Sequence, residues 1–385
     1  MNETTQKFLA KPSSSYKMLM WSTLALSILG AVMVFSASSI YSLENKGNSF
    51  SIIGRQLFFL VIAIPIGFLA SRQKLDRWKK LARFGFLFSG IVLVIVAIPG
   101  VGKEVNGNQN WISLGFVDIQ PSEIVKMLMI LWAAHMLASR EHAGLHRTNV
   151  LALITPGFVL VMGLIMLGRD LGTAAVFAAI LAGLLWVSGV SGRIFGAVTA
   201  AGFSLIALAI VMSPYRAQRL LVVFNPFAPE DYKNAGWQPA HSLLGLASGG
   251  IFGVGLGGSR QKWGNLAEAH TDFIFSVIGE ELGLFGTLST LALLSVLLFS
   301  IFKIALRAKD PMVRYVSSGI GCWIAIQTIL NIGSTLSVIP VVGVTLPLVS
   351  YGGSALIATY MGIGFVIGAA RRDPAIFDEL KKSEF

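Results

Sequence analysis

Long apolar segments recur along almost the whole of this 385-residue chain. A helix needs roughly 20 apolar residues to cross a bilayer core about 30 Å thick. Ten segments meet that requirement, at residues 18–40, 51–71, 81–99, 121–139, 149–167, 171–190, 193–212, 273–302, 314–339 and 347–370. Because backbone polar groups inside a bilayer must be satisfied internally, such segments form helices. The sequence therefore predicts an all-α, polytopic integral membrane protein with about ten transmembrane helices.

The composition and the distribution of charge agree with this class. Hydrophobic residues make up 54% of the chain and charged residues only 13%, which excludes an ordinary soluble domain. The net charge of +11 would suggest nucleic acid binding in a soluble protein. With a cytoplasmic N-terminus, however, alternating connections collect about 20 of the 30 Lys and Arg residues on one side. We therefore expect both termini to be cytoplasmic and no nucleic acid partner.

The positions of the spans divide the chain into three parts. A cytoplasmic segment at 1–17 precedes a membrane domain at 18–370, and a cytoplasmic tail follows at 371–385. Within the membrane domain, residues 213–271 form one long extracytoplasmic loop between the seventh and eighth spans. Loops of this length are usually functional or disordered. The aromatic and apolar content of this one favours an ordered loop.

Ionisable side chains occur at the outer ends of several spans, where such groups are usually functional. Glu123 and Lys126, in "QPSEIVK", are three residues apart and share a helix face. They form an ion pair at a helix end, a charged wall of a polar cavity, or both. In "GRDLGT", Asp170 suits the N-cap of the following helix, whereas Arg169 could face an anionic ligand.

The long loop opens with two arginines and later contains a glycine-rich stretch. Arg216 and Arg219 are three residues apart, and planar guanidinium groups bind phosphate oxygens bidentately. These arginines bind either a phosphate or pyrophosphate ligand or the headgroups of membrane lipids. The seven glycines between Gly249 and Gly264 lack the spacing of a dinucleotide-binding fingerprint. They instead favour backbone that bends and approaches closely at the membrane surface.

Three carboxylates lie at and beyond the start of the eighth span, in "EAHTDFIFSVIGEELG". Asp272 falls at the outer end, where it serves either as a general base or as a helix cap. Glu280 and Glu281 lie about 12 Å further along a helix that rises 1.5 Å per residue. We expect this second pair to order buried bases or helix ends.

The last two spans carry a polar face and a break. Gln327 and Asn331 are four residues apart and share one face of the ninth span. The following "IPVVGVTLPLVSYGGS" contains two prolines and several glycines, which break helical backbone. Broken backbone at membrane depth is tolerated where it is buried in protein or lines a cavity. The polar faces of the fourth, eighth and ninth spans are therefore expected to line one cavity open to the outer leaflet.

Five of these motifs, in this order, resemble the SEDS family (shape, elongation, division and sporulation), typified by FtsW and RodA. They are "QPSEIVK", "DLGT", "GGIFGVGLG", "EAHTDFIFSVIGEELG" and "IPVVGVTLPLVSYGGS", and the resemblance runs from the first span to the last. The stretches "HTDFIFSVIGEELG" and "GSRQKWGNLAEAH" are more similar to the FtsW type, which serves division. Ala267 departs from the family, which usually has proline there.

The resemblance implies a peptidoglycan glycosyltransferase that polymerises lipid II at the outer face of the bacterial cytoplasmic membrane, at the division septum. It implies a class B penicillin-binding protein and other division proteins as partners. Asp272 matches the family's essential aspartate and is expected to be the general base on the acceptor hydroxyl. The remaining residues expected to bind substrate are Glu123, Lys126, Arg169, Arg216, Arg219, His270, Gln327, Asn331 and Ser350. No metal-ligand cluster is recognisable, so a requirement for Mg²⁺ or Mn²⁺ stays open.

Three other functions remain as alternatives. A lipid II flippase would use the acidic and basic groups at 123, 126, 280 and 281 as a charge or proton relay. A RodA-like polymerase would serve elongation in place of division. A non-catalytic scaffold does not need acids inside a span. Because most of the polar candidates sit in the outer half of the membrane, the sequence favours chemistry at the outer face.

Overall fold

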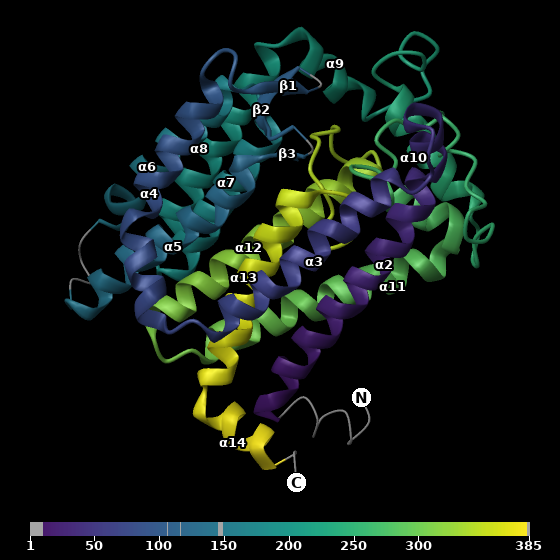
Figure 1. Ribbon diagram of the computed structural model, residues 1–385. Coiled ribbons are helices and arrows are strands. Elements are labelled where there is room, and N and C mark those ends of the chain that lie inside the picture. Colours follow the sequence, from purple (N-terminus) through teal and green to yellow (C-terminus); the bar gives the residue numbers. More distant parts are fainter. Residues whose placement is uncertain (1–10, 106, 116, 145–148, 383–385) are drawn as a thin grey trace.

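The computed structural model describes residues 11–105, 107–115, 117–144 and 149–382. Nine helices in these ranges are long and apolar enough to cross a membrane. They are α2 (Pro12–Lys46), α3 (Ser51–Arg72), α4 (Leu75–Ala97), α5 (Pro121–His142), α6 (Val150–Leu167), α8 (Gly192–Val211), α11 (Ile274–Arg307), α12 (Pro311–Thr335) and α13 (Gly353–Arg372). The apolar α7 (Leu171–Val187) is shorter, at 17 residues. Each of the ten expected spans is therefore present as a helix (Figure 1).

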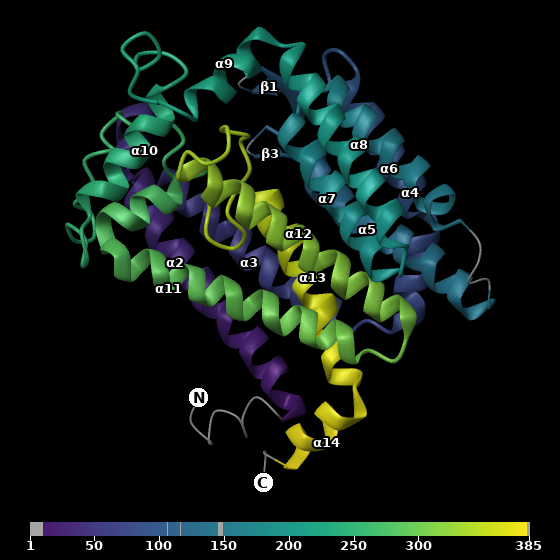
Figure 2. The same ribbon diagram turned by 180° about the vertical axis from the view of Figure 1, so that it is seen from behind.

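The helices form two groups that α12 joins. On one side α4, α5, α6, α7 and α8 lie together, and on the other α2 packs against α3 and α11 (Figures 1 and 2). α12 packs against α5 and α7 in the first group and against α11 in the second. α13 packs along α3 and also contacts α5. α12 and the chain that follows it are thus in contact with both groups.

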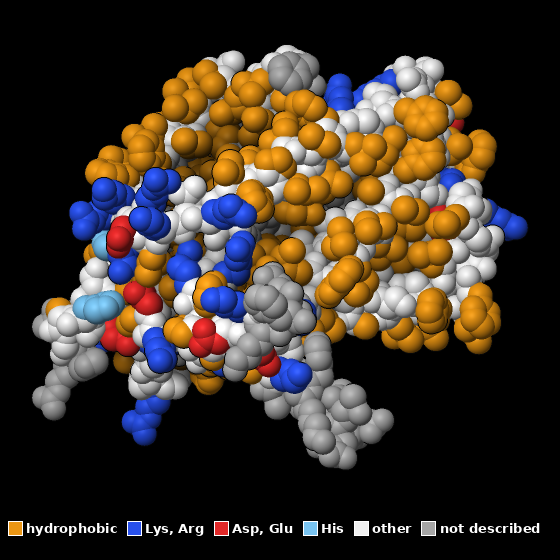
Figure 3. Space-filling model, turned by 60° about the horizontal axis from the view of Figure 1, so that its bottom comes forward, with side chains coloured by type: hydrophobic (Ala, Val, Ile, Leu, Met, Phe, Trp, Pro, Cys, Tyr) orange, Lys and Arg blue, Asp and Glu red, His pale blue; other side chains and the backbone are white. Residues whose placement is uncertain are grey.

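The outer surface of the bundle is apolar, as contact with lipid requires. No described residue of α8 is buried, and Phe203, Leu205 and Val211 are 69%, 67% and 73% exposed. Lys and Arg side chains gather at the end that carries α14 (Pro374–Lys382) (Figure 3). There the Ser13 backbone amide donates to Glu379 Oε2 at 2.7 Å, so the described chain ends meet. Assignment of this basic end to the cytoplasm stays a prediction.

The opposite end carries a small sheet and two short helices. Strands β1 (Lys103–Val105), β2 (Asn108–Ser113) and β3 (Asp118–Ile119) pair antiparallel in that order. The sequence reading did not predict this sheet. Residues 213–271 contain α9 (Pro214–Val222) and α10 (Trp237–Ser248), so the expectation of an ordered loop is confirmed.

Every helix departs from the predicted bounds of its span, by six residues at each end of α2, and the eighth span is interrupted. α12 ends at Thr335 instead of 339, and α13 begins at Gly353 instead of 347. The intervening residues contain Pro340 and Pro347, which cannot continue a helix. α11 is not the continuous helix expected over 273–302, because Gly283 adopts φ 68° and ψ −161° within it. Positive φ of this kind favours glycine, which has no Cβ.

Candidate active site

Asp272 lies just before α11, on backbone that is held from a remote part of the chain. Three consecutive carbonyls, at residues 270–272, each accept a hydrogen bond. The donors are the Tyr351 amide to the His270 carbonyl (2.9 Å), Ser350 Oγ to the Thr271 carbonyl (2.6 Å) and Asn331 Nδ2 to the Asp272 carbonyl (2.8 Å). We call Asn331, Ser350 and Tyr351 the carbonyl clamp. α12 and the segment after it therefore fix the position of Asp272.

The clamp residues are themselves held. Asn331 Nδ2 also donates to the Val344 carbonyl at 2.8 Å, and Ser350 Oγ accepts from the Leu346 amide at 2.8 Å. His270 packs between Tyr41 and Tyr351, with ring centroids 5.5 and 5.6 Å away. Burial lowers the pKa of this histidine, so its neutral form is favoured. The structure thus gives His270, Asn331 and Ser350 roles in positioning Asp272, and their contact with substrate stays a prediction.

Asp272 is half-buried. Over the described ranges, no residue hydrogen-bonds to this carboxylate. Gly343 faces it so closely that an added Cβ would lie 3.6 Å from Asp272 Oδ2. Burial, and then the negative charge of Glu268, raises the pKa of Asp272 to about 7, although the charge of Arg219 opposes the rise. A carboxylate with a pKa close to neutrality is suited to general base catalysis.

α9 brings the two loop arginines to this site. Arg216 Nη2 donates to the Arg169 carbonyl at 3.2 Å, which ties α9 to the turn before α7. Arg219 Nη1 donates to the Val341 carbonyl at 3.2 Å, two residues before Gly343. Arg169 itself is exposed and has a positive φ of 64°. Arg219 is close enough to Asp272 for its charge to lower the pKa of that carboxyl. Binding of an anionic group by the two arginines stays a prediction.

Asp170 is the N-cap of α7. Its Oδ1 accepts from the Thr173 amide at 2.9 Å, and its Oδ2 accepts from Thr173 Oγ1 at 2.7 Å. The same Oδ2 also accepts from Asn110 Nδ2 at 2.6 Å and from Gln120 Nε2 at 3.3 Å. The capping interpretation of Asp170 is confirmed, and the cap also ties β2 and the start of α5 to α7.

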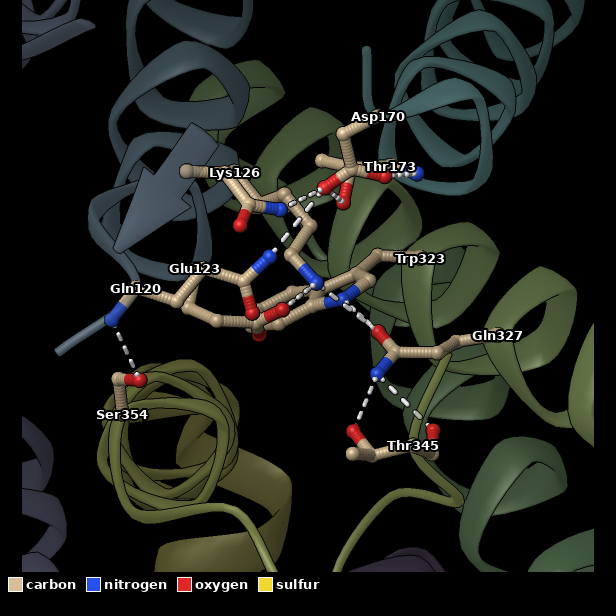
Figure 4. A network of polar contacts seen from close by, with 10 residues as sticks. Gln120, Glu123, Lys126, Asp170, Thr173, Trp323, Gln327, Thr345 and Ser354 are labelled. Atoms are coloured by element: carbon tan, nitrogen blue, oxygen red, sulfur yellow. Dashed lines mark hydrogen bonds and ion pairs between the residues drawn. The ribbon is translucent and has the colours of Figure 1, made fainter. Parts of the chain in front are cut away.

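Glu123 and Lys126 form a buried ion pair inside a larger polar network (Figure 4). Lys126 Nζ lies 2.8 Å from Glu123 Oε1 and 3.1 Å from Gln327 Oε1. Trp323 Nε1 donates to the same Gln327 oxygen at 2.6 Å, and Gln327 Nε2 donates to the Thr345 carbonyl at 3.0 Å. A buried pair persists when such extra hydrogen bonds compensate its desolvation. The predicted ion pair is confirmed, whereas substrate binding by Glu123, Lys126 and Gln327 stays a prediction.

Glu280 and Glu281 hold the end of the long loop. Glu280 accepts from the Arg260 amide at 2.8 Å and from Ser259 Oγ. Glu281 Oε1 lies 3.0 Å from Lys262 Nζ and 2.8 Å from Ser36 Oγ of α2. The expected role was to order buried bases or helix ends; the contact with Lys262 confirms the first, and the Arg260 amide belongs to the loop, not to a helix end. Sequence reasoning missed Lys262, because nothing local pairs it with a carboxylate 19 residues later.

Within the described ranges, no group of three or more His, Cys, Asp or Glu residues is arranged to hold a metal ion.

The fold and the site define a class of protein: a polytopic membrane protein whose half-buried Asp272 lies near Arg219 at one end of the bundle. Residues 17–374 match the model of the FtsW/RodA/SpoVE family, described as cell cycle proteins. The chain belongs to this family.

Named relatives and solved structures match this chain over most of its length. A probable peptidoglycan glycosyltransferase FtsW of Mycobacterium tuberculosis (strain ATCC 25618 / H37Rv) is 36% identical over 367 residues, covering 95% of this chain and 70% of the relative. The protein of the same name from Coxiella burnetii is 39% identical, covering 90% and 94%. RodA of Thermus thermophilus superposes with a TM-score of 0.69 at 29% identity, covering 92% and 95%. A chain of a peptidoglycan synthase complex superposes with a TM-score of 0.75 at 30% identity, covering 92% and 96%.

Proposed function

We propose that this chain is a peptidoglycan glycosyltransferase that polymerises lipid II at the outer face of the bacterial cytoplasmic membrane. The observation that carries the proposal is Asp272, whose backbone is clamped, whose carboxylate accepts no hydrogen bond from the described residues, and whose pKa is raised to about 7. Relatives that bear the name peptidoglycan glycosyltransferase FtsW support the same activity. The groups beside Asp272 suit each part of this substrate.

Lipid II is a disaccharide-pentapeptide joined to undecaprenyl pyrophosphate, so its binding site needs an apolar surface, cations and a base. The apolar outer surface of the bundle can receive the polyprenyl chain. Arg216 and Arg219 of α9 supply the cations, because guanidinium groups bind phosphate oxygens bidentately. Asp272 lies close enough to Arg219 for the arginine charge to act on its carboxyl.

The reaction is a single displacement. Asp272 takes the proton from the 4-hydroxyl of the acceptor GlcNAc, and that oxygen attacks the anomeric carbon of the donor MurNAc. The glycosidic bond forms as the bond to the lipid pyrophosphate breaks, and the configuration at that carbon inverts. The charge that develops on the departing pyrophosphate is stabilised by Arg216 and Arg219. Because the pKa of Asp272 is close to neutrality, the base is about half deprotonated at pH 7.

A partner that cross-links the glycan strand completes the proposal. The solved complex that resembles this chain is described as coordinating polymerization and crosslinking. We expect a class B penicillin-binding protein to take that part here. Relatives named FtsW favour division over elongation, with both termini cytoplasmic, other division proteins as partners and the septum as the place of action.

The experiment is polymerisation of purified lipid II by the reconstituted protein, with and without its cognate penicillin-binding protein. Glycan strands resolved by length on a gel are the expected product. The same vesicles report whether lipid II changes leaflet, which separates a polymerase from a flippase. Movement of lipid II without any polymer, in both conditions, would overturn the proposal. The fixed contacts of Glu123, Lys126, Glu280 and Glu281 argue against a mobile charge relay.

A further inference from the structure

Residues 249–258 form an exposed segment of unusual composition, which we call the glycine-rich segment. Its ten residues are glycine, isoleucine, phenylalanine, valine and leucine only. The four apolar side chains are exposed: Ile251 63%, Phe252 82%, Val254 48% and Leu256 61%. The connection from α10 to α11 lies at the edge of the molecule (Figure 2). Contiguous exposed apolar side chains of this kind mark a surface that another apolar phase covers.

The backbone of this segment bridges the break in α11. In a regular helix the amides of residues 284 and 285 would donate to the carbonyls of Glu280 and Glu281. Here those amides donate instead to the carbonyls of Gly250 (2.9 Å) and Ile251 (3.1 Å). The Glu280 and Glu281 carbonyls accept from the amides of Val254 (2.9 Å) and Gly255 (3.0 Å). Four bonds to the glycine-rich segment thus replace two missing helical bonds.

Glycine permits this close approach. A Cβ at Gly249 would lie 1.9 Å from the Gly279 carbonyl oxygen, and one at Gly253 would lie 2.1 Å from the Glu281 carbonyl oxygen. At Gly283 an added Cβ would lie 2.3 Å from the Gly253 amide nitrogen. Further bonds join the Gly253 amide to the Gly249 carbonyl (2.8 Å) and the Gly258 amide to the Gly255 carbonyl (3.0 Å). These bonds satisfy part of the segment's backbone, which lowers the free-energy cost of bringing non-helical backbone into a bilayer.

The apolar surface of the segment continues onto the spanning part of α11. Leu284, Phe285 and Leu288, just after the break, are 52%, 68% and 54% exposed. The bonds of the Leu284 and Phe285 amides place these side chains beside the segment. Arg260 and Trp263 follow the segment, and Trp263 is 62% exposed. Tryptophan and arginine are typical anchors at the boundary between hydrocarbon and headgroups.

We infer that the glycine-rich segment inserts its four apolar side chains into the hydrocarbon of the leaflet at the Asp272 end. The occupant is lipid, because the exposed side chains are all apolar and continue onto the lipid-facing side of α11, to whose backbone the segment is bonded. Glu280 and Glu281, whose backbone carbonyls bond to the segment, lie in α11, the helix that begins just after Asp272. The insertion therefore sets the depth of the carboxylate relative to the bilayer.

Nitroxide labels on introduced cysteines test this inference in the full-length protein. The native Cys322 is first replaced by alanine, and labels are placed singly at Phe252→Cys and Leu256→Cys. Leu288→Cys marks the spanning helix and Asn234→Cys marks the exposed loop. Each variant is reconstituted in phosphatidylethanolamine–phosphatidylglycerol nanodiscs. Electron paramagnetic resonance then compares label relaxation by oxygen, which concentrates in hydrocarbon, with relaxation by a water-soluble nickel chelate.

The labels at 252 and 256 should show an oxygen-to-nickel ratio like that at 288 and several-fold above that at 234. A ratio at 252 and 256 equal to that at 234 would place the segment in water and overturn the inference. Low access of both reagents at 252 and 256 would show that protein covers them, which also overturns it. Phe252 and Leu256 are exposed, so both substitutions leave the packed interior unchanged. The readout needs no lipid II, so it stands or falls separately from the proposed activity.

Discussion

The raised pKa of Asp272 makes a defined prediction about pH. Burial and Glu268 move the pKa of this carboxyl from an ordinary 3.8 to about 7. Since only the deprotonated form can take the proton of the acceptor hydroxyl, kcat/KM for lipid II polymerisation should fall as pH drops below 7. At pH 6 about one tenth of the molecules, and at pH 5 about one hundredth, would carry the active base.

Two substitutions should move the acidic limb of this pH–rate profile, the fall in kcat/KM at low pH, in opposite directions. Arg219→Ala removes a positive charge that lowers the pKa of Asp272, so the limb should shift to higher pH. Glu268→Gln removes a negative charge that raises it, so the limb should shift to lower pH. Glutamine can still accept the hydrogen bond that Thr271 Oγ1 donates to Glu268 Oε2 at 2.8 Å.

The assay is the initial rate of glycan synthesis from purified lipid II between pH 5 and 9, corrected for folded protein at each pH. Arg219→Lys is the matched control, because it keeps the charge and should leave the limb near its original position. An acidic limb near pH 4 in the native protein would show that the pKa of the base is not raised, which contradicts the prediction. A limb near 7 that neither charge substitution moves would also contradict it, because the titrating group would then not be Asp272.

Other predictions concern stability, measured as the apparent Tm in detergent. Because burial disfavours its charged form, ionised Asp272 lowers the free energy of unfolding; this loss is absent below pH 3.8 and complete above about pH 7. Asp272→Asn should therefore be at least as stable as the native protein at pH 8. A lower Tm for this variant would contradict the raised pKa. Asn331→Ala leaves the Asp272 and Val344 carbonyls without their donor, so the free energy of unfolding should fall by about 2–4 kcal/mol. An unchanged Tm would argue against the carbonyl clamp. Lys126→Met alone should lower the free energy of unfolding by about 3–5 kcal/mol, because it leaves Glu123 buried without its partner. Lys126→Met combined with Glu123→Gln should recover part of that stability. No recovery would argue against the buried pair. Gly283→Ala should destabilise strongly, while Gly163→Ala, with open space around it, should not; equal effects would contradict the close approach at the break.

Hydropathy was enough to predict the helices, because the bilayer requires a long apolar segment for each crossing. It could not set every boundary. α12 ends at Thr335, just before Ser337 with its positive φ of 53°, and Pro340 and Pro347 keep the apolar residues that follow from continuing as helix. The small sheet was missed because its strands are short and polar, and their pairing depends on turns at Gly107 and Gly115, with φ of 83° and 86°.

The candidate site was predictable in its residue types and less so in their partners. Asp272, Arg216 and Arg219 were identified from the chemistry of their side chains, and the structure brings Arg219 near Asp272 and ties Arg216 to the turn before α7. Asn331 was recognised as polar, but its partner, the Asp272 carbonyl, lies 59 residues away and has no local signal. The break at Gly283 escaped notice for the same reason, since its hydrogen-bond partners belong to the glycine-rich segment.

Asp272 is proposed as the base that activates the acceptor hydroxyl. Glycan-strand synthesis per folded molecule, compared between the native protein and Asp272→Asn, measures this role. Glu230→Gln, an exposed carboxylate of the same loop, is the control and should polymerise normally. Asparagine keeps the shape of the side chain but cannot accept the proton, so synthesis should fall by at least about 10²-fold with lipid II binding retained. Polymerisation by Asp272→Asn at a near-native rate would contradict the account.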